Sequence, residues 1–184
     1  MSLGLAALAA AIENTDEFHL ARLLVLIRAN AKRSDKPVNG IMKLAKLDFL
    51  LRYPSCLRRA LLALGRKSAA ESIPEDERNT IEARMVRFRF GPWDKRYRRW
   101  IGLLVAKGLA QTYLQGKTVN IALTESGKRV AEELAELPDF KSLADRSALI
   151  ATALGDFGGS RLKEFIYRVF PEIVDMQWGR SIEL

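Results

Sequence analysis

The side chains that most often carry out covalent catalysis are scarce in this sequence and far apart. His19 is the sole histidine and Cys56 the sole cysteine, and the helical patterns around them predict two different helices. A cysteine and a histidine can act as nucleophile and base when a third group orients the base, but nothing near either residue suits that role. We therefore expect Cys56 to be a buried structural thiol. A zinc site would need several cysteine or histidine ligands, so no metal is expected.

Two other motifs contain residue types that are found in active sites. Residues 155–159 (GDFGG) have the glycines of a phosphate-binding loop, but no strand precedes them and no Lys-Ser/Thr pair follows. The Asp-Phe-Gly triplet within them matches one kinase motif, while every other kinase element is missing. The acidic residues 75–77 and 132–133 are typical of solvated faces. The sequence therefore predicts no catalytic residue and no cofactor, and we expect a protein that is not an enzyme.

Positive charge is concentrated between Arg84 and Arg99. Seven cationic side chains stand there against the single carboxylate of Asp94, a net charge of +6 in a chain of net charge +8. Alternation over residues 85–90 predicts a half-buried strand with its two arginines on the face opposite its valine and phenylalanines. Helical spacing places Lys95, Arg98 and Arg99 on one side of the next helix. The candidate residues for binding nucleic acid or a partner are Arg84, Arg87, Arg89, Lys95, Arg96, Tyr97, Arg98, Arg99 and Lys117.

This mixture of arginine and aromatic residues has three interpretations. Nucleic-acid surfaces use cations for phosphates and aromatic rings for stacking. Arginine and tryptophan are equally the residues that dominate protein interfaces. Alternatively, Trp93, Tyr97 and Trp100 are core residues and the arginines pair with acidic groups.

The elements that would position these residues form the back half of a winged helix. We expect a helix capped by Asp94 and ended by Gly108, a hairpin over residues 109–123, and a helix capped by Thr124. A helix-turn-helix needs a helix ending three or four residues before the recognition helix, and a strand with a Gly-Pro turn occupies that space. Lys117 is the only cation of the wing, so non-specific contact with the DNA backbone is favoured over base reading.

The whole chain has the composition of one globular domain of the mostly α class, with a small antiparallel sheet (α+β). It has 184 residues, of which 48% are hydrophobic and 28% charged, and a pI near 9.8. We expect a winged-helix core with additional N- and C-terminal helices. The regions are an N-terminal helical region (1–65), a loop of polar or poorly ordered residues (66–80), a winged-helix region (81–137) and a C-terminal helical region (138–184).

The two ends of the chain carry apolar segments. Residues 1–13 predict a short helix or packing arm. Its apolar run over residues 3–12 is too short to span a bilayer and lacks the basic segment of a signal peptide. Asn14 with Glu17 resembles a capping box for the helix over residues 18–33. With a single cysteine, this favours a cytoplasmic protein. Near the C-terminus, a second apolar stripe is either core or a tentative partner-docking surface; its residues are Leu162, Phe165, Ile166, Val169, Phe170 and Trp178.

Four phrases of the sequence occur together in a known family: residues 43–54 (KLAKLDFLLRYP), 84–94 (RMVRFRFGPWD), 123–127 (LTESG) and 165–174 (FIYRVFPEIV). The chain resembles, over roughly residues 17–180, the small middle (accessory) subunit of ABC-three-component and Lamassu-type antiphage systems. That resemblance implies an adaptor without catalytic activity. Its partners would be an SMC-like ATPase, an effector that is often a nuclease, and possibly double-stranded DNA, with no membrane.

Weaker resemblances leave other functions open. The Gly91-Pro92 turn followed by a helix and a wing is similar to Panacea-type antitoxins, and residues 94–134 alone resemble MarR-type regulators. A winged-helix transcription regulator and an antitoxin are therefore the alternatives.

Overall fold

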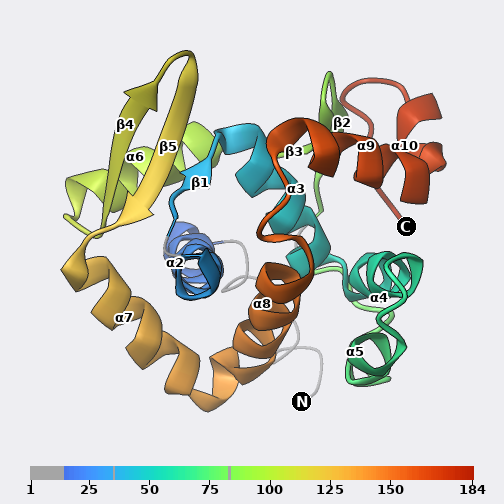
Figure 1. The fold of residues 1–184 in the computed structure, drawn as a ribbon, viewed down its shortest axis with the longest axis horizontal. Coiled ribbons are helices and arrows are strands. Elements are labelled where there is room, and N and C mark those ends of the chain that lie inside the picture. Colours follow the sequence, from blue (N-terminus) through green and yellow to red (C-terminus); the bar gives the residue numbers. More distant parts are fainter. Residues whose placement is uncertain (1–14, 35, 83) are drawn as a thin grey trace, which may run out of the picture.

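A computed structural model describes residues 15–34, 36–82 and 84–184 (Figure 1). Helices predominate, and the strands form one three-stranded and one two-stranded antiparallel sheet, so the predicted fold class is confirmed. The elements are α2 (Asp16–Ser34), β1 (Val38–Asn39), α3 (Ile41–Arg52), α4 (Pro54–Ala63), α5 (Lys67–Glu71), β2 (Val86–Phe88), β3 (Gly91–Trp93), α6 (Tyr97–Ala106), β4 (Ala110–Gln115), β5 (Thr118–Leu123), α7 (Glu125–Glu136), the short 3₁₀ helix η1 (Pro138–Phe140), α8 (Lys141–Leu154), α9 (Gly159–Val169) and α10 (Pro171–Asp175).

Helix α3 lies at the centre of the core. Every residue from Lys43 to Arg52 is buried, including the leucines on all sides of the helix. Helix α2 packs between α3, α7 and α8, and in Figure 1 it is seen end-on with α7 and α8 curving around it. Within the described ranges, no helix is both long enough and apolar enough to cross a membrane. The predicted apolar arm over residues 3–12 lies outside the described residues.

The three-stranded sheet completes a winged helix whose parts come from both halves of the chain. Its strand order is β1-β5-β4, and Val38 pairs with Ile121. The succession α2, β1, α3, α6, β4, β5 with this pairing is that of a winged helix. The winged-helix region was predicted to begin at residue 81. That prediction misses β1, because a strand of two residues has no alternation pattern of its own and is recognised only through its pairing with β5.

A long insertion separates α3 from α6 and contains α4, α5 and the β2–β3 hairpin. Part of it was predicted to be a polar or poorly ordered loop over residues 66–80. The structure instead has helix α5 there, since Ala70 and Ile73 are buried in the core. The Arg78 guanidinium also donates to the Ile73 carbonyl (3.0 Å) and holds the following turn. Two buried apolar residues in a polar stretch are too few to give the periodic pattern of a helix.

The predicted helix caps have different outcomes. The Thr124 hydroxyl accepts from the Gly127 amide (3.0 Å), so this cap is confirmed. Asp94 does not cap α6 directly, because the helix begins at Tyr97 after a turn in which Asp94 accepts from the Arg96 amide (3.0 Å). At the start of α2, the Thr15 hydroxyl accepts from the Phe18 amide (3.3 Å). Asn14, the predicted cap, lies outside the described residues.

Candidate interaction surface

The structure divides the predicted basic-aromatic residues between the core and the surface. Tyr97 and Trp100 are fully buried, as the core interpretation predicts, and Arg87 is 6% exposed. Arg96 is half-buried, with its guanidinium 4.7 Å from the centre of the Trp100 ring. The residues that remain exposed are Arg84, Arg89, Lys95, Arg98, Arg99 and Lys117.

The β2–β3 hairpin presents the opposite face from the one that was predicted. Arg87 is buried over the Tyr167 ring of α9 (5.6 Å), whereas Phe88 and Phe90 are 44% and 42% exposed. The reason is that Arg87 turns toward α9, where its guanidinium group lies over the aromatic ring of Tyr167. In addition, Arg89 and Phe90 are the two turn residues of the hairpin, so the strand alternation ends at Phe88.

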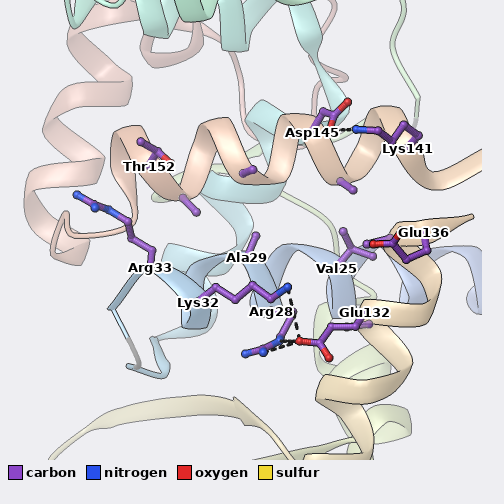
Figure 2. A pocket seen from close by; sticks show the side chains of 15 residues that line it. Val25, Arg28, Ala29, Lys32, Arg33, Glu132, Glu136, Lys141, Asp145 and Thr152 are labelled. Carbon is purple, nitrogen blue, oxygen red and sulfur yellow. Dashed lines mark hydrogen bonds and ion pairs between the residues drawn. The ribbon is translucent and has the colours of Figure 1, made fainter.

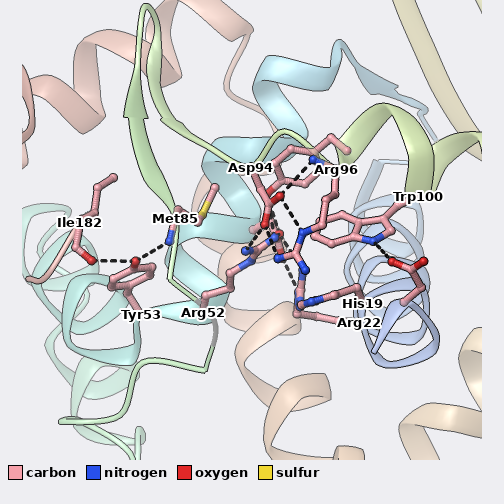
Figure 3. A network of polar contacts seen from close by, with 12 residues as sticks. His19, Arg22, Arg52, Tyr53, Met85, Asp94, Arg96, Trp100 and Ile182 are labelled. Carbon is pink, nitrogen blue, oxygen red and sulfur yellow. Dashed lines mark hydrogen bonds and ion pairs between the residues drawn. The ribbon is translucent and has the colours of Figure 1, made fainter. Parts of the chain in front are cut away.

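A buried network of charged groups accounts for much of the polarity around α6. The Asp48 carboxylate is fully buried and accepts from Arg22 Nε (2.8 Å), Arg52 Nε (2.9 Å) and Tyr97 Oη (2.6 Å). Arg52 also donates to Asp94 (3.1 Å), and Figure 3 shows the side chains of Arg22, Arg52 and Asp94 converging. The network therefore joins α2, α3 and the start of α6, which are the three helices of the winged helix.

The charge states of this network follow from its geometry. Burial alone would raise the pKa of Asp48, but the adjacent guanidinium groups of Arg22 and Arg52 outweigh it and hold this pKa well below its usual range. Burial is likewise outweighed at Asp94, where hydrogen bonds from Arg96 and the charge of Arg52 lower the pKa to about 2. Both carboxylates are therefore ionised at neutral pH, and each is occupied by arginine donors.

His19 and Cys56 lie in surroundings that disfavour catalysis. Burial, together with the positive charge of Arg22, lowers the pKa of His19 to about 3, and its Nδ1 lies 2.5 Å from Arg22 Nη1. The ring is therefore neutral and accepts a hydrogen bond. Cys56 is buried as predicted, and burial raises the pKa of its thiol to about 12. A thiol that stays protonated is a weak nucleophile.

Two exposed aromatic side chains and a half-buried one form a surface that the sequence did not reveal. Phe88 of β2 stacks on Trp93 of β3, with 6.1 Å between ring centres, and lies 6.2 Å from the ring of Trp178 near the C-terminus. Trp178 is 65% exposed. We call Phe88, Trp93 and Trp178 the aromatic surface. Beside it, in the hairpin turn, the Arg89 guanidinium lies 5.2 Å from the centre of the Phe90 ring.

Backbone pairing on both sides of β2 holds the aromatic surface in place. Strand β3 pairs on one side, and the C-terminal segment runs along the other, where Arg87 donates to the Arg180 carbonyl (2.8 Å) and Gly179 donates to the Arg87 carbonyl (2.7 Å). Buried Ile182 anchors this segment. Its carbonyl accepts from the Tyr53 hydroxyl (2.9 Å), which itself accepts from the Met85 amide (2.8 Å; Figure 3). The tail could not be paired with β2 from the sequence, because its only local signal is the Trp-Gly turn.

The predicted C-terminal docking stripe is mostly core. Phe165 and its neighbours on α9 pack against α3 and α4, and Phe170 meets Phe49 edge to face (5.6 Å). Only the last residue of the predicted set, Trp178, reaches the surface. The buried residues of the set are Leu162, Phe165, Ile166, Val169 and Phe170.

The exposed side of α6 offers a limited basic surface. Lys95 and Arg98 lie exposed at its start and form no ion pair with any residue that the structure describes, whereas Arg99 pairs with Asp16 (2.5 Å). The exposed positions further along the helix are Gly102, Val105 and Ala106, which have no polar side-chain groups for reading base edges.

A hollow of about 450 Å³ lies between α2, α7 and α8, and most of the charged side chains that line it form ion pairs (Figure 2). Alanines line its floor. At its rim, Glu132 accepts from Arg28 (2.6 Å) and pairs with Lys32 (3.5 Å), while Lys141 pairs with Asp145. No group of histidine, cysteine or carboxylate side chains suited to a metal ion occurs in the described part of the chain.

Comparison with protein-family models, with curated proteins and with solved structures finds no match for this chain. The candidate interaction surface therefore rests on the geometry given above.

Proposed function

We propose that this chain is a winged-helix adaptor subunit that acts by binding other proteins and carries out no chemistry itself. The aromatic surface is the observation that carries the proposal. Phe88 and Trp178 together expose large apolar rings to solvent, and arginines stand close by in the hairpin turn and tail. Tryptophan, phenylalanine and arginine are the residues enriched at the centres of protein interfaces.

The rigidity of this surface supports a role in binding. Strand β2 is paired on both sides, and the ring centre of Trp93 lies 5.3 Å from that of the buried Tyr97, which belongs to the charged network. A surface that is already ordered loses little conformational entropy when a partner docks. The aromatic surface therefore has the properties of a preformed docking site.

The partners follow from the resemblance described above and are part of the proposal. They are an SMC-like ATPase and an effector, which the chain would bridge in a cytoplasmic antiphage complex. The exposed Lys95, Arg98 and Lys117 favour an additional weak contact with the DNA backbone.

Co-expression with an SMC-like ATPase encoded beside this gene tests the proposal. We expect the two proteins to co-purify, and a Phe88→Ser, Trp178→Ala double variant to lose the ATPase while keeping its melting temperature. Leu62→Ser is the matched control, because Leu62 is an exposed apolar residue (38%) on α4, away from the hairpin. If the double variant retains the ATPase as well as the control does, the aromatic surface is not the docking site.

Two other experimental outcomes would contradict the adaptor function and identify a different one. A salt-dependent footprint on palindromic half-sites in its own promoter would identify a transcription regulator. Lethality on deletion of this gene, relieved by deletion of its neighbour, would identify an antitoxin.

A further inference from the structure

Strand β4 has an open edge that lacks the usual protection against pairing. Among the residues that the structure describes, its backbone pairs only with β5, and Figure 1 shows it at the outer side of the wing. Its six residues pair with β5 in continuous register without a bulge, and they include neither a charged residue nor proline. Edge strands of monomeric proteins are normally blunted by such features. The backbone groups along this edge are therefore free to accept another strand.

The side chains of β4 are unusually exposed for a strand of this composition. Every residue after Ala110 is exposed, and Leu114, at 72%, is the most exposed of the large hydrophobic residues in the described ranges. Tyr113 is 48% exposed on the other face of the strand. A strand added at this edge would place its own side chains beside those of β4 on both faces of the sheet.

We propose that β4 pairs with β4 of a second copy of this chain, antiparallel across a twofold axis. Identical strands are self-complementary in this arrangement. Charge also favours the second copy, because two chains of net charge +8 repel each other except where they meet through neutral surface, and β4 is neutral. The proposal is independent of the adaptor function.

A twofold axis at Tyr113 gives the pairing in which the sheet continues without interruption. Tyr113 then lies opposite Tyr113 of the second copy, and Leu114 lies opposite Thr112, so that apolar groups meet on the same face. The turn cation, Lys117, is four residues from the axis. The two lysines are therefore roughly 26 Å apart, well beyond the range of strong repulsion.

The size of the interface limits its strength. A six-residue strand pair buries less than the roughly 1,200 Å² of stable interfaces, so we expect a dimer with a Kd on the order of micromolar or weaker. Sedimentation velocity over a range of concentrations should show monomers converting to dimers. Tyr113→Lys, which places like charges directly opposite each other, should raise the Kd at least about tenfold.

Cysteine cross-linking tests the register. In an antiparallel pair, directly opposed residues have Cα atoms about 4.5–5.5 Å apart, within disulfide range. Tyr113→Cys should therefore form a covalent dimer under mild oxidation. Lys117→Cys is the matched control on the same wing and should stay monomeric, and the native Cys56 is buried and does not interfere.

Three results would overturn the proposal. The first is a chain that stays monomeric at every concentration, with Tyr113→Cys and Lys117→Cys cross-linking equally slowly. The second is a dimer whose Kd is unchanged by Tyr113→Lys. The third is a dimer in which Lys117→Cys cross-links as fast as Tyr113→Cys, which would place the contact elsewhere. Melting curves of the variants show whether each one folds.

Discussion

At the residue scale, Asp48 is the carboxylate that two buried arginines share, and Arg52 has a second carboxylate partner in Asp94. Arg22 and Arg52 are both fully buried, and each donates to this one carboxylate. A buried ion pair contributes little to the stability of the folded protein compared with an apolar pair in the same place. Removing one partner, however, leaves an uncompensated charge in the core and is strongly destabilising. The main role of Asp48 is therefore to offset the cost of burying the positive charges of the two arginines.

We expect Asp48→Asn to lower the free energy of unfolding by about 3–5 kcal/mol, because it leaves the buried Arg22 without a carboxylate partner among the described residues and Arg52 with Asp94 alone. Urea denaturation followed by circular dichroism measures this loss. Asp145→Asn is the control, since its pair with Lys141 is solvent-exposed and such pairs contribute at most about 1 kcal/mol. Equal losses in the two variants would show that the network does not hold the helices together.

The neutral His19 predicts a loss of stability in mildly acidic solution. Its pKa is about 3 in the folded chain and near 6.5 when unfolded, so between these values the unfolded chain binds one more proton. Stability then falls as pH falls, by about 1.4 kcal/mol per pH unit. Unfolding of wild type and His19→Gln between pH 6.5 and 4.5 should differ by this slope. Parallel profiles would mean that His19 is protonated in the folded chain. Asp94 contributes only at lower pH, because its depressed pKa removes stability between about pH 4 and 2.

At the element scale, the junction between the wing and α7 depends on a close backbone contact. A Cβ atom on Gly127 would lie 1.8 Å from the Leu109 carbonyl oxygen. The Thr124 amide donates to that same carbonyl (3.1 Å), and the Thr124 hydroxyl donates to the Gly108 carbonyl (2.7 Å). The start of α7 is therefore fixed against the start of β4.

Gly127→Ala should cost at least about 2 kcal/mol of stability, because backbone must move to admit the methyl group. Gly102→Ala makes the matched comparison. This glycine lies in α6 with nothing within 4 Å of its Cβ position, so the substitution should stabilise the protein by up to about 1 kcal/mol. Thermal unfolding measures the stability of both variants. A Gly127→Ala protein as stable as wild type would contradict the described junction.

Long periodic segments were predictable from the sequence, and elements defined by distant pairing were not. The pattern around Leu23 and Leu24 predicts α2, and the alternation of Val119, Ile121 and Leu123 predicts β5. Strand β1 has two residues and needs β5 to exist, so no local pattern indicates it. The burial of Arg87 was mispredicted because only Tyr167, 80 positions further on, determines which face of β2 turns inward.

Single residues of the candidate site were predictable from the sequence, but the way in which distant segments bring them together was not. Arg89 and Trp178 were both named from the sequence, but as members of separate surfaces. Hydrogen bonds between β2 and the C-terminal segment bring the hairpin and Trp178 together. Composition and periodicity do not predict such pairing. Arg96 and Arg99 were candidate contacts, yet the structure pairs them with Asp94 and Asp16.

At the scale of the whole molecule, a net charge of +8 predicts weak, sequence-independent binding to duplex DNA at low salt. Reversing both Lys95 and Arg98 to Glu should weaken it and reduce the slope of log K against log [salt] by roughly 2, one unit for each lost phosphate contact. Fluorescence anisotropy with two unrelated duplexes measures both effects.

Arg66→Glu with Lys67→Glu supplies the control, because these two exposed cations lie at the start of α5, in the inserted segment. An equal effect of both double variants would mean that net charge alone, and no particular surface, draws the protein to DNA.

The pairing of Val38 with Ile121 also constrains how the protein is made on the ribosome. The first strand leaves the exit tunnel roughly eighty residues before its partner, a delay of about 4–16 s at ordinary translation rates. Throughout that interval Val38 has no strand to pair with, and for the first part of it Arg52 also lacks its partner Asp94, so the nascent N-terminal half cannot complete its core. Slow codons placed before residue 123 should therefore lower the soluble yield, whereas the same codons placed after it should not.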